Sequence, residues 1–208
     1  MNNLLPSACV LCGDRAQPPI DLCAPCKASL PWLSTAADGV MALCHYVPPF
    51  DRLITALKFK ERLLYARLLS ELLLEQVRDQ WYIQAPLPEL LIPMPLHADR
   101  LRERGFNQAV ELARPLAKQL KIPLDLRSCQ RIRATQAQLT LSATERQRNM
   151  DKAFTVKPDL SARHVAIIDD VVTTGHTMAA LSSELRKAGV EQIDVWCCAR
   201  TPLPARKA

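Results

Sequence analysis

The spacing of hydrophobic residues changes along the chain, and each change predicts an element. Leucines between residues 64 and 73 recur every four residues and line one broad helical face, so we expect a core-packing helix over 59–81. The apolar run ELLIPMPL, residues 89–96, ends in prolines and predicts a buried strand. A second amphipathic helix is expected over 106–122, and Pro115 should kink or interrupt it.

The carboxyl-terminal third follows the order strand, loop, helix, strand. HVAIID (164–169) predicts a buried strand and QIDVWCCA (192–199) a second one. Between them, DVVTTG (170–175) is expected to be a loop and HTMAALSSELRKAG (176–189) a helix closed by its glycine. This order implies a parallel sheet, in which ligands bind where loops leave the carboxyl ends of the strands. The polar, arginine-bearing stretch 124–149 is weakly periodic, and we expect much of it to be mobile.

Length and composition predict a soluble globular protein. The chain has 208 residues, 49% of them apolar, which is enough to bury one main domain with a small appendage. Its opening, MNNLLPSACVLC, lacks the basic and apolar regions of a secretion signal. No stretch approaches the roughly 18 uncharged apolar residues of a membrane-spanning helix. We therefore expect a cytoplasmic protein without a transmembrane segment.

The charge of the chain bears on its partners. A net charge of +6 favours a polyanionic partner or a phosphorylated ligand, although a modest basic excess is also common on ordinary soluble surfaces. Aromatic residues make up 5% of the chain, which gives little support to a base-stacking platform for single strands.

Four of the eight cysteines form two CxxC pairs near the amino terminus, Cys9 with Cys12 and Cys23 with Cys26. Thiolates two residues apart in a tight turn can occupy two corners of a tetrahedral metal site, and one structural zinc ion is the expected occupant. A pair of redox dithiols, or ordinary small residues, is the alternative. We expect a compact zinc ribbon with its linker over 1–38 and the main domain over 39–208. The other four cysteines show no metal spacing and are expected to be buried: Cys44, Cys129, Cys197 and Cys198.

The residues that join the predicted strand 164–169 to the predicted helix 176–189 are the candidate ligand-binding residues. Unpaired N–H groups at the start of a helix favour an anion, and the threonines nearby add hydroxyl donors, so this segment predicts a phosphate site. Asp169 and Asp170 can accept hydrogen bonds from vicinal hydroxyls or help to hold Mg²⁺. A phosphate beside a diol describes a ribose 5-phosphate. The alternative is an acidic turn that caps a helix.

The stretch IIDDVVTTGHT resembles the 5-phosphoribosyl 1-pyrophosphate binding motif of type I phosphoribosyltransferases. Over nearly its entire length the chain is similar to the ComF (GntX-like) family of competence proteins. The similarity includes the cysteine pairs, LKF at 57–59, PMPL at 93–96, RGFNQ at 104–108 and QLTLSATERQRN at 138–149. It implies an α/β fold with a Rossmann-like parallel sheet of the type I phosphoribosyltransferase kind and a small amino-terminal four-cysteine zinc ribbon. It also implies Mg²⁺ dependence.

The resemblance assigns roles to particular residues. Asp169 and Asp170 would contact the ribose hydroxyls, and with Arg104 they are the implied catalytic residues. The rest of the phosphoribosyl-binding motif would be Val171, Val172, Thr173, Thr174, Gly175, His176 and Thr177. The pyrophosphate loop would contain Arg104, Gly105, Asn107 and Gln108. A flexible loop that closes over the site would contain Gln138, Arg146 and Asn149. The zinc ligands would be Cys9, Cys12, Cys23 and Cys26.

One position departs from the family motif, which usually has serine where His176 stands. The backbone N–H of this residue can still serve the phosphate, although one hydroxyl contact is lost. Several arginines flank the expected site. Each alone is expected on a solvated rim, and together they would favour a phosphate-rich ligand: Arg100, Arg102, Arg104, Arg131, Arg133, Arg146 and Arg148.

Two functions from different classes remain open. As a ComF-family protein, the chain would act in natural transformation and handle incoming single-stranded DNA on the cytoplasmic side. Its implied partners are a competence helicase and the inner-membrane DNA channel, with a peripheral position at the inner membrane. As a phosphoribosyltransferase, it would join a base to ribose 5-phosphate in nucleobase or nucleotide salvage. The two functions are compatible, because one site can bind 5-phosphoribosyl 1-pyrophosphate or a nucleotide, and no segment identifies an acceptor base.

Overall fold

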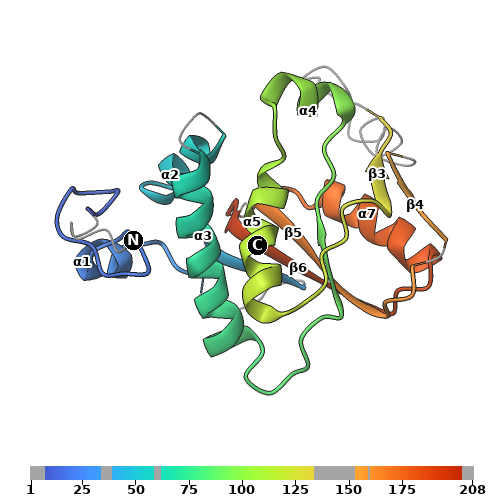
Figure 1. Cartoon of the computed structure of the whole chain (residues 1–208), viewed down its shortest axis with the longest axis horizontal. Coiled ribbons are helices and arrows are strands. Elements are labelled where there is room, and N and C mark those ends of the chain that lie inside the picture. The colour runs from blue at the N-terminus through green and yellow to red at the C-terminus, as the bar shows by residue number, and fades with distance from the viewer. Residues whose placement is uncertain (1–7, 34–38, 59–61, 134–152, 159, 203–208) are drawn as a thin grey trace, which may run out of the picture.

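A computed structural model describes residues 8–33, 39–58, 62–133, 153–158 and 160–202 (Figure 1). Its centre is a four-stranded sheet in the order β1-β6-β5-β2, in which every neighbouring pair is parallel. The predicted parallel α/β sheet is therefore confirmed. The strands are β1 (Val40–His45), β2 (Leu90–Pro93), β5 (His164–Val172) and β6 (Gln192–Arg200).

Helices cover both faces of the sheet. Successive residues of a strand point to opposite faces, so Ile168 belongs to one apolar cluster and Ile167 to the other. The helices on the Ile168 side are α2 (Phe50–Leu57), α3 (Arg62–Gln76) and α5 (Gln108–Leu120). On the Ile167 side lies α7 (His176–Lys187) (Figure 1).

The leucine pattern correctly predicts α3, but one leucine of the predicted core face is exposed. Leu68, Leu69, Leu72 and Leu73 are 0–1% exposed, whereas Leu64 is 42% exposed. From Val77 to Trp81 the helix widens into a π-helical turn, η1. The helix therefore covers the predicted region from residue 62 onward.

The connection between β2 and α5 contains a short helix for which there was no expectation from the sequence. This helix, α4 (Ala98–Arg104), begins after His97, whose Nδ1 accepts a hydrogen bond of 3.3 Å from the backbone N–H of Asp99. It ends at Gly105, whose φ of 78° lies in the left-handed region that glycine adopts without strain. The expected interruption at Pro115 is wrong, because α5 runs on through this half-buried residue, while a kink there stays a prediction.

Strand β5 is longer than predicted. The sequence reasoning ended it at Asp169, but Val171 pairs with Ala199 and Val172 with Arg200 on β6. A neighbouring strand of equal length satisfies the backbone groups of these residues, and only Thr173–Gly175 remain as the loop.

A two-stranded antiparallel sheet, β3 (Cys129–Arg131) with β4 (Phe154–Val156), flanks the segment 134–152. Most of the stretch expected to be mobile lies in that segment, outside the described residues, and so do the predicted flexible-loop residues Gln138, Arg146 and Asn149.

The amino-terminal module contains α1 (Ala24–Ala28) and lies beside α2 and α3 (Figure 1). Its buried Leu22 and Leu30 belong to the same apolar cluster as α3, and Lys27 Nζ lies 2.5 Å from Glu75 Oε2 of that helix. A domain boundary after residue 38 stays a prediction. Among the described residues, no helix has the length and apolar character needed to span a membrane.

Candidate functional site

The carboxylates of Asp169 and Asp170 lie at the carboxyl end of β5. Asp169 Oδ1 accepts a hydrogen bond of 2.8 Å from the backbone N–H of Asp170, and Asp170 is only 6% exposed. Burial and the neighbouring Asp170 raise the pKa of Asp169 well above its ordinary value, while Lys58 acts in the opposite direction. Two acidic groups are thus concentrated where a donor of hydroxyl protons or a cation would relieve their repulsion.

Two basic side chains interact electrostatically with this pair, and only Arg131 was among the arginines expected to flank the site. Lys58 Nζ, at the end of α2, lies 3.3 Å from Asp170 Oδ2. The guanidinium of Arg131, on β3, lies 5.6 Å from the centre of the Phe154 ring. Burial and the charge of Arg100 lower the pKa of Arg131, and Asp169 raises it, which brings Arg131 into the same electrostatic environment.

Sequence signals for these two residues were weak. Lys58 falls in the LKF segment that supported the family resemblance, but its spacing from Asp170 gives no hint of a contact. Arg131 belonged to a cluster expected on a solvated rim. It is instead half-buried in the described structure.

The phosphate loop leads from β5 into α7. Gly175 is the N-cap residue with φ of 78°, and no side chain caps the helix, so its first N–H groups are available to an anion. Thr173 and Thr174 are exposed and Thr177 is half-buried. These features are compatible with a phosphate site, and phosphate binding by this loop stays a prediction.

The unusual His176 contacts the loop itself. Its Nδ1 lies 3.0 Å from Thr174 Oγ1, at hydrogen-bonding distance, so the imidazole can orient that hydroxyl. Val171 and Val172 are strand residues that pair with β6. Their side chains pack in the two apolar clusters, and their contribution to the motif is therefore structural.

A hollow of about 510 Å³ adjoins the phosphate loop. Its walls come from the loop, one side of α7 and parts of β1 and β6, and its basic residues are Arg186 and Arg200. Asp169 and Asp170 do not line it. The loop therefore borders the carboxylate pair on one side and a basic hollow on the other.

The predicted pyrophosphate loop follows the neighbouring strand β2. Asn107 caps α5 by accepting a 2.9 Å hydrogen bond from the Ala109 N–H, and its Nδ2 donates to the carbonyl of Met94 at 3.0 Å. Met94 in turn donates its backbone N–H to the carbonyl of Ile168 at 2.8 Å. The loop and the carboxylate pair are thus at the same edge of the sheet. Arg104 is half-buried, Gly105 exposed and Gln108 buried.

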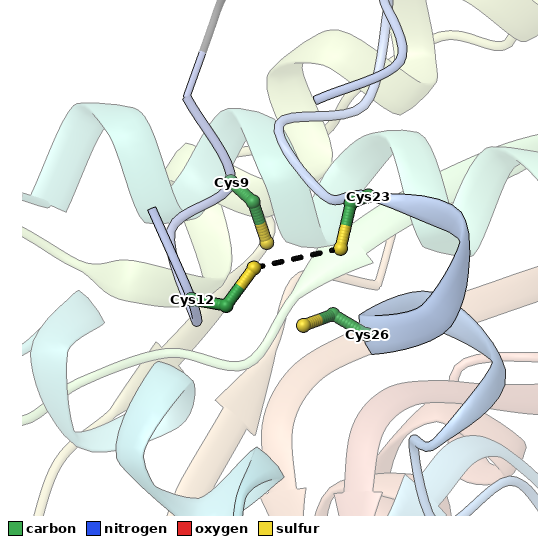
Figure 2. Close-up of side chains that lie close together, drawn as sticks. All are labelled: Cys9, Cys12, Cys23 and Cys26. Carbon is green, nitrogen blue, oxygen red and sulfur yellow. Dashed lines mark hydrogen bonds between the residues drawn. The ribbon is translucent and has the colours of Figure 1, made fainter. Parts of the chain in front are cut away.

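The four amino-terminal cysteines converge in space (Figure 2). All their Sγ atoms lie within 4.8 Å of one another, and those of Cys12 and Cys23 are 3.6 Å apart, beyond the length of a disulfide. Burial raises the pKa of Cys9, but backbone hydrogen bonds from Cys23, Cys12 and Leu11 outweigh it and bring the pKa to about 6. This donor set suits a tetrahedral metal ion such as Zn²⁺.

The remaining cysteines behave as predicted. All four are buried in the described structure: Cys44, Cys129, Cys197 and Cys198. Burial raises the pKa of each thiol, which makes them unreactive packing residues.

The chain is thus an α/β protein with a parallel sheet, and an acidic pair and an uncapped helix start lie at the carboxyl ends of its strands. The phosphoribosyl transferase domain family matches residues 107–206. Competence protein F of Haemophilus influenzae is 38% identical over 197 residues, covering 92% of this chain and 84% of that protein. DNA utilization protein YhgH of Salmonella typhi is 36% identical over 197 residues, covering 94% and 85%.

The chain belongs to the competence protein F/YhgH family, as its sequence motifs predicted. Among solved structures, a purine phosphoribosyltransferase from Pyrococcus horikoshii is similar, with 19% identity, coverage of 82% of this chain and 99% of that one, and a TM-score of 0.32. The phosphoribosyl transferase match begins at residue 107, so Lys58 and the cysteine cluster lie outside it.

Proposed function

We propose that the protein acts in DNA uptake, handles single-stranded DNA on the cytoplasmic side, and uses a ribose 5-phosphate site to bind 5-phosphoribosyl 1-pyrophosphate or a nucleotide. The names of its relatives, competence protein F and DNA utilization protein YhgH, support the proposed role in DNA uptake. The phosphoribosyl transferase match supports the ligand class. A competence helicase, the inner-membrane DNA channel and peripheral attachment to the inner membrane are the partners and position that we propose.

One observation carries the ligand assignment: the Asp169–Asp170 pair and the uncapped start of α7 are separated only by the end of β5 and a three-residue loop. The carboxylates suit the two hydroxyls of a ribose, and the helix start suits its 5-phosphate. In ribose 5-phosphate, the hydroxyl pair and the phosphate are carried by the same sugar ring. The closeness of the carboxylates and the helix start along the chain supports this ligand class.

The basic hollow extends the same argument to DNA. Arg186 and Arg200 line it beside the phosphate loop. If the terminal phosphate of a single-stranded DNA bound at the start of α7, the positive charge of the hollow would attract the next phosphate groups of that DNA. A terminal nucleotide and the activated sugar would then compete for one site.

Two metals fit the residues present. Asp170 Oδ2 is buried and, apart from its ion pair with Lys58, makes no hydrogen bond to any described residue, so it could coordinate Mg²⁺, which prefers oxygen ligands. When bound with 5-phosphoribosyl 1-pyrophosphate, Mg²⁺ would neutralise charge on the pyrophosphate. Zn²⁺ would be held by Cys9, Cys12, Cys23 and Cys26 and would have a structural role.

The second candidate is an active phosphoribosyltransferase, and the charges around the site favour it. Transfer of a ribosyl group passes through a cationic sugar, which Asp169 and Asp170 can stabilise electrostatically, while Arg104 would bind the departing pyrophosphate. No protein nucleophile is needed for this reaction. Release of pyrophosphate upon addition of a panel of nucleobases would distinguish this candidate from a binding protein.

Calorimetric titration tests the proposal. 5-Phosphoribosyl 1-pyrophosphate with Mg²⁺ should bind the wild-type protein, and the double variant Asp169→Ala/Asp170→Ala should lose binding while keeping its fold. A short oligonucleotide with a 5′-phosphate should displace the sugar, whereas the same oligonucleotide with a 5′-hydroxyl should not. Sugar binding that ignores both oligonucleotides would favour the enzyme, and unchanged binding by the double variant would refute the site.

A further inference from the structure

The side chain of Lys58 reaches the carboxylate pair from outside the phosphoribosyl transferase match. Its Nζ is 3.3 Å from Asp170 Oδ2, and its side chain is 33% exposed while that of Asp170 is 8% exposed. The ammonium group therefore lies between the buried carboxylate and solvent.

The packing of α2 fixes the place of this lysine. Phe50, Leu53, Ile54 and Leu57 are 0–2% exposed and anchor the helix in the apolar core. Lys58 is the C-cap residue, and its backbone N–H bonds to the carbonyl of Thr55 at 3.0 Å. The helix contacts β6 and α3, so its end is held against the sheet.

Asp170 points to the side from which Lys58 comes. The 3.3 Å between its Oδ2 and Lys58 Nζ places the carboxylate beside the end of α2, whose buried residues share an apolar cluster with Ala166 and Ile168 of β5. Its Oδ2 makes no hydrogen bond to any described residue, which leaves Lys58 as its ion-pair partner. A buried carboxylate requires such a counter-charge, because desolvation strongly disfavours an isolated negative group.

We propose that Lys58 is a positioning residue of the ribose-phosphate site and exchanges its partner when the ligand binds. Without ligand, Lys58 holds the Asp170 carboxylate. When a ribose hydroxyl or Mg²⁺ takes that carboxylate, the ammonium group is released to a phosphate of the ligand, at the mouth of the site. This inference rests on the proposed function and extends the site to the amino-terminal half of the chain.

The exchange predicts opposite effects of one substitution on two probes. Lys58→Met removes the charge and keeps much of the side-chain length. It should weaken binding of 5-phosphoribosyl 1-pyrophosphate with Mg²⁺ by roughly tenfold or more, the loss expected for one charge-assisted contact. It should strengthen binding of Mn²⁺ alone severalfold, because the competing cation is gone. Lys58→Arg keeps the charge, so its affinities for the sugar and for Mn²⁺ should both be close to those of the wild-type protein.

Lys27→Met is the matched control. Lys27 is 36% exposed and forms an ion pair with Glu75 on α3, so the variant loses a similar surface pair away from the carboxylates. It should change neither probe. All variants are compared by titration calorimetry for the sugar, by electron paramagnetic resonance for Mn²⁺, and by thermal unfolding.

Opposite shifts in the two affinities, reversed by Lys58→Arg, support the exchange. Unchanged affinities in Lys58→Met overturn it. Parallel losses of both affinities that Lys58→Arg does not restore also overturn it, since they indicate a merely structural role. If the wild-type protein binds no 5-phosphoribosyl 1-pyrophosphate, the proposed function fails. The Mn²⁺ measurement then decides whether Lys58 is the counter-charge of Asp170: a gain supports that assignment and no gain overturns it.

Discussion

Asp169 accepts a hydrogen bond of 2.8 Å from the backbone N–H of Asp170, so the two carboxylates are held side by side at the end of β5. This arrangement disfavours charge on Asp169, whose pKa is raised well above the ordinary value of 3.8 by burial and by Asp170. Asp169→Asn should therefore raise the melting temperature at pH values above the raised native pKa, where the wild-type protein carries the full penalty, while abolishing ligand binding.

The pH dependence follows from the direction of that shift. The native state holds the Asp169 proton more tightly than the unfolded chain does, so wild-type stability falls as pH rises from 3.8 through the raised native pKa. The advantage of Asp169→Asn should grow as pH rises from 3.8 to the raised native pKa, as measured by thermal unfolding. An advantage that shrinks over this range would contradict the assignment.

Asp125 provides a control of opposite sign. Burial tends to raise its pKa, but hydrogen bonds from Ser128 and Arg127 outweigh this and lower it. The lowered pKa contributes stability that is present above 3.8 and lost as pH falls through the native value. Asp125→Asn should therefore lower the melting temperature at neutral pH and leave ligand binding intact.

Gly175 adopts φ of 78° at the start of α7, and a Cβ built there meets no atom within 4 Å. Gly175→Ala should cost about 1 kcal/mol through backbone strain alone, and the shifted N–H groups should weaken phosphate binding. Gly189→Ala is the matched control, because Gly189 also has a positive φ, of 95°, but follows the other end of the helix. Urea unfolding should show similar losses in both variants, with reduced binding of 5-phosphoribosyl 1-pyrophosphate only in the first. Equal affinities would argue against a phosphate at this loop.

The sequence could predict those parts of the site that are contiguous in the chain. The end of β5, its loop and the start of α7 follow one another, so the candidate ligand-binding residues can be recognised in one short segment of the sequence. The cysteine pairs are equally local, because each CxxC fixes two ligands in one turn. Their convergence within 4.8 Å matches the predicted metal site.

Contacts between residues that are far apart in the chain could not be predicted from local sequence patterns. Lys58 reaches Asp170 only because α2, which the sequence reasoning did not predict, packs against β6. The extra length of β5 likewise depends on its neighbour, since Val172 pairs with Arg200. Leu64 fits the helical repeat but is exposed, because periodicity gives a face and not the extent of the surface that covers it.

The cysteine cluster predicts a dependence of stability on metal. Purified protein should contain about one zinc per chain, the content of a single four-cysteine site. Because Leu22 and Leu30 of this module are buried in the same cluster as α3, removal of zinc by a chelator should lower the melting temperature of the protein as a whole. Cys23→Ser should have the same effect, whereas Cys129→Ser should leave the zinc content unchanged. A fully folded, metal-free preparation with wild-type stability would exclude a structural zinc ion.

A polar network at the opposite edge of the sheet should affect stability alone. Tyr82 donates to Asp194 Oδ2 at 2.5 Å and accepts a 2.9 Å hydrogen bond from the indole N–H of the buried Trp196. His164, the first residue of β5, contacts the same Asp194 oxygen at 2.6 Å. Tyr82→Phe leaves the indole N–H without this acceptor.

The expected loss in Tyr82→Phe is about 1–3 kcal/mol in urea unfolding, the cost of an unsatisfied buried polar group. Tyr46→Phe, which alters another half-buried tyrosine of the same core, is the control for removal of a hydroxyl. Binding of 5-phosphoribosyl 1-pyrophosphate should be the same in both variants and in the wild-type protein. His164 and Asp194 belong to the amino-terminal ends of β5 and β6, whereas the carboxylate pair lies toward the carboxyl end of β5. A loss of affinity in Tyr82→Phe without a loss of stability would mean that the two edges of the sheet are coupled.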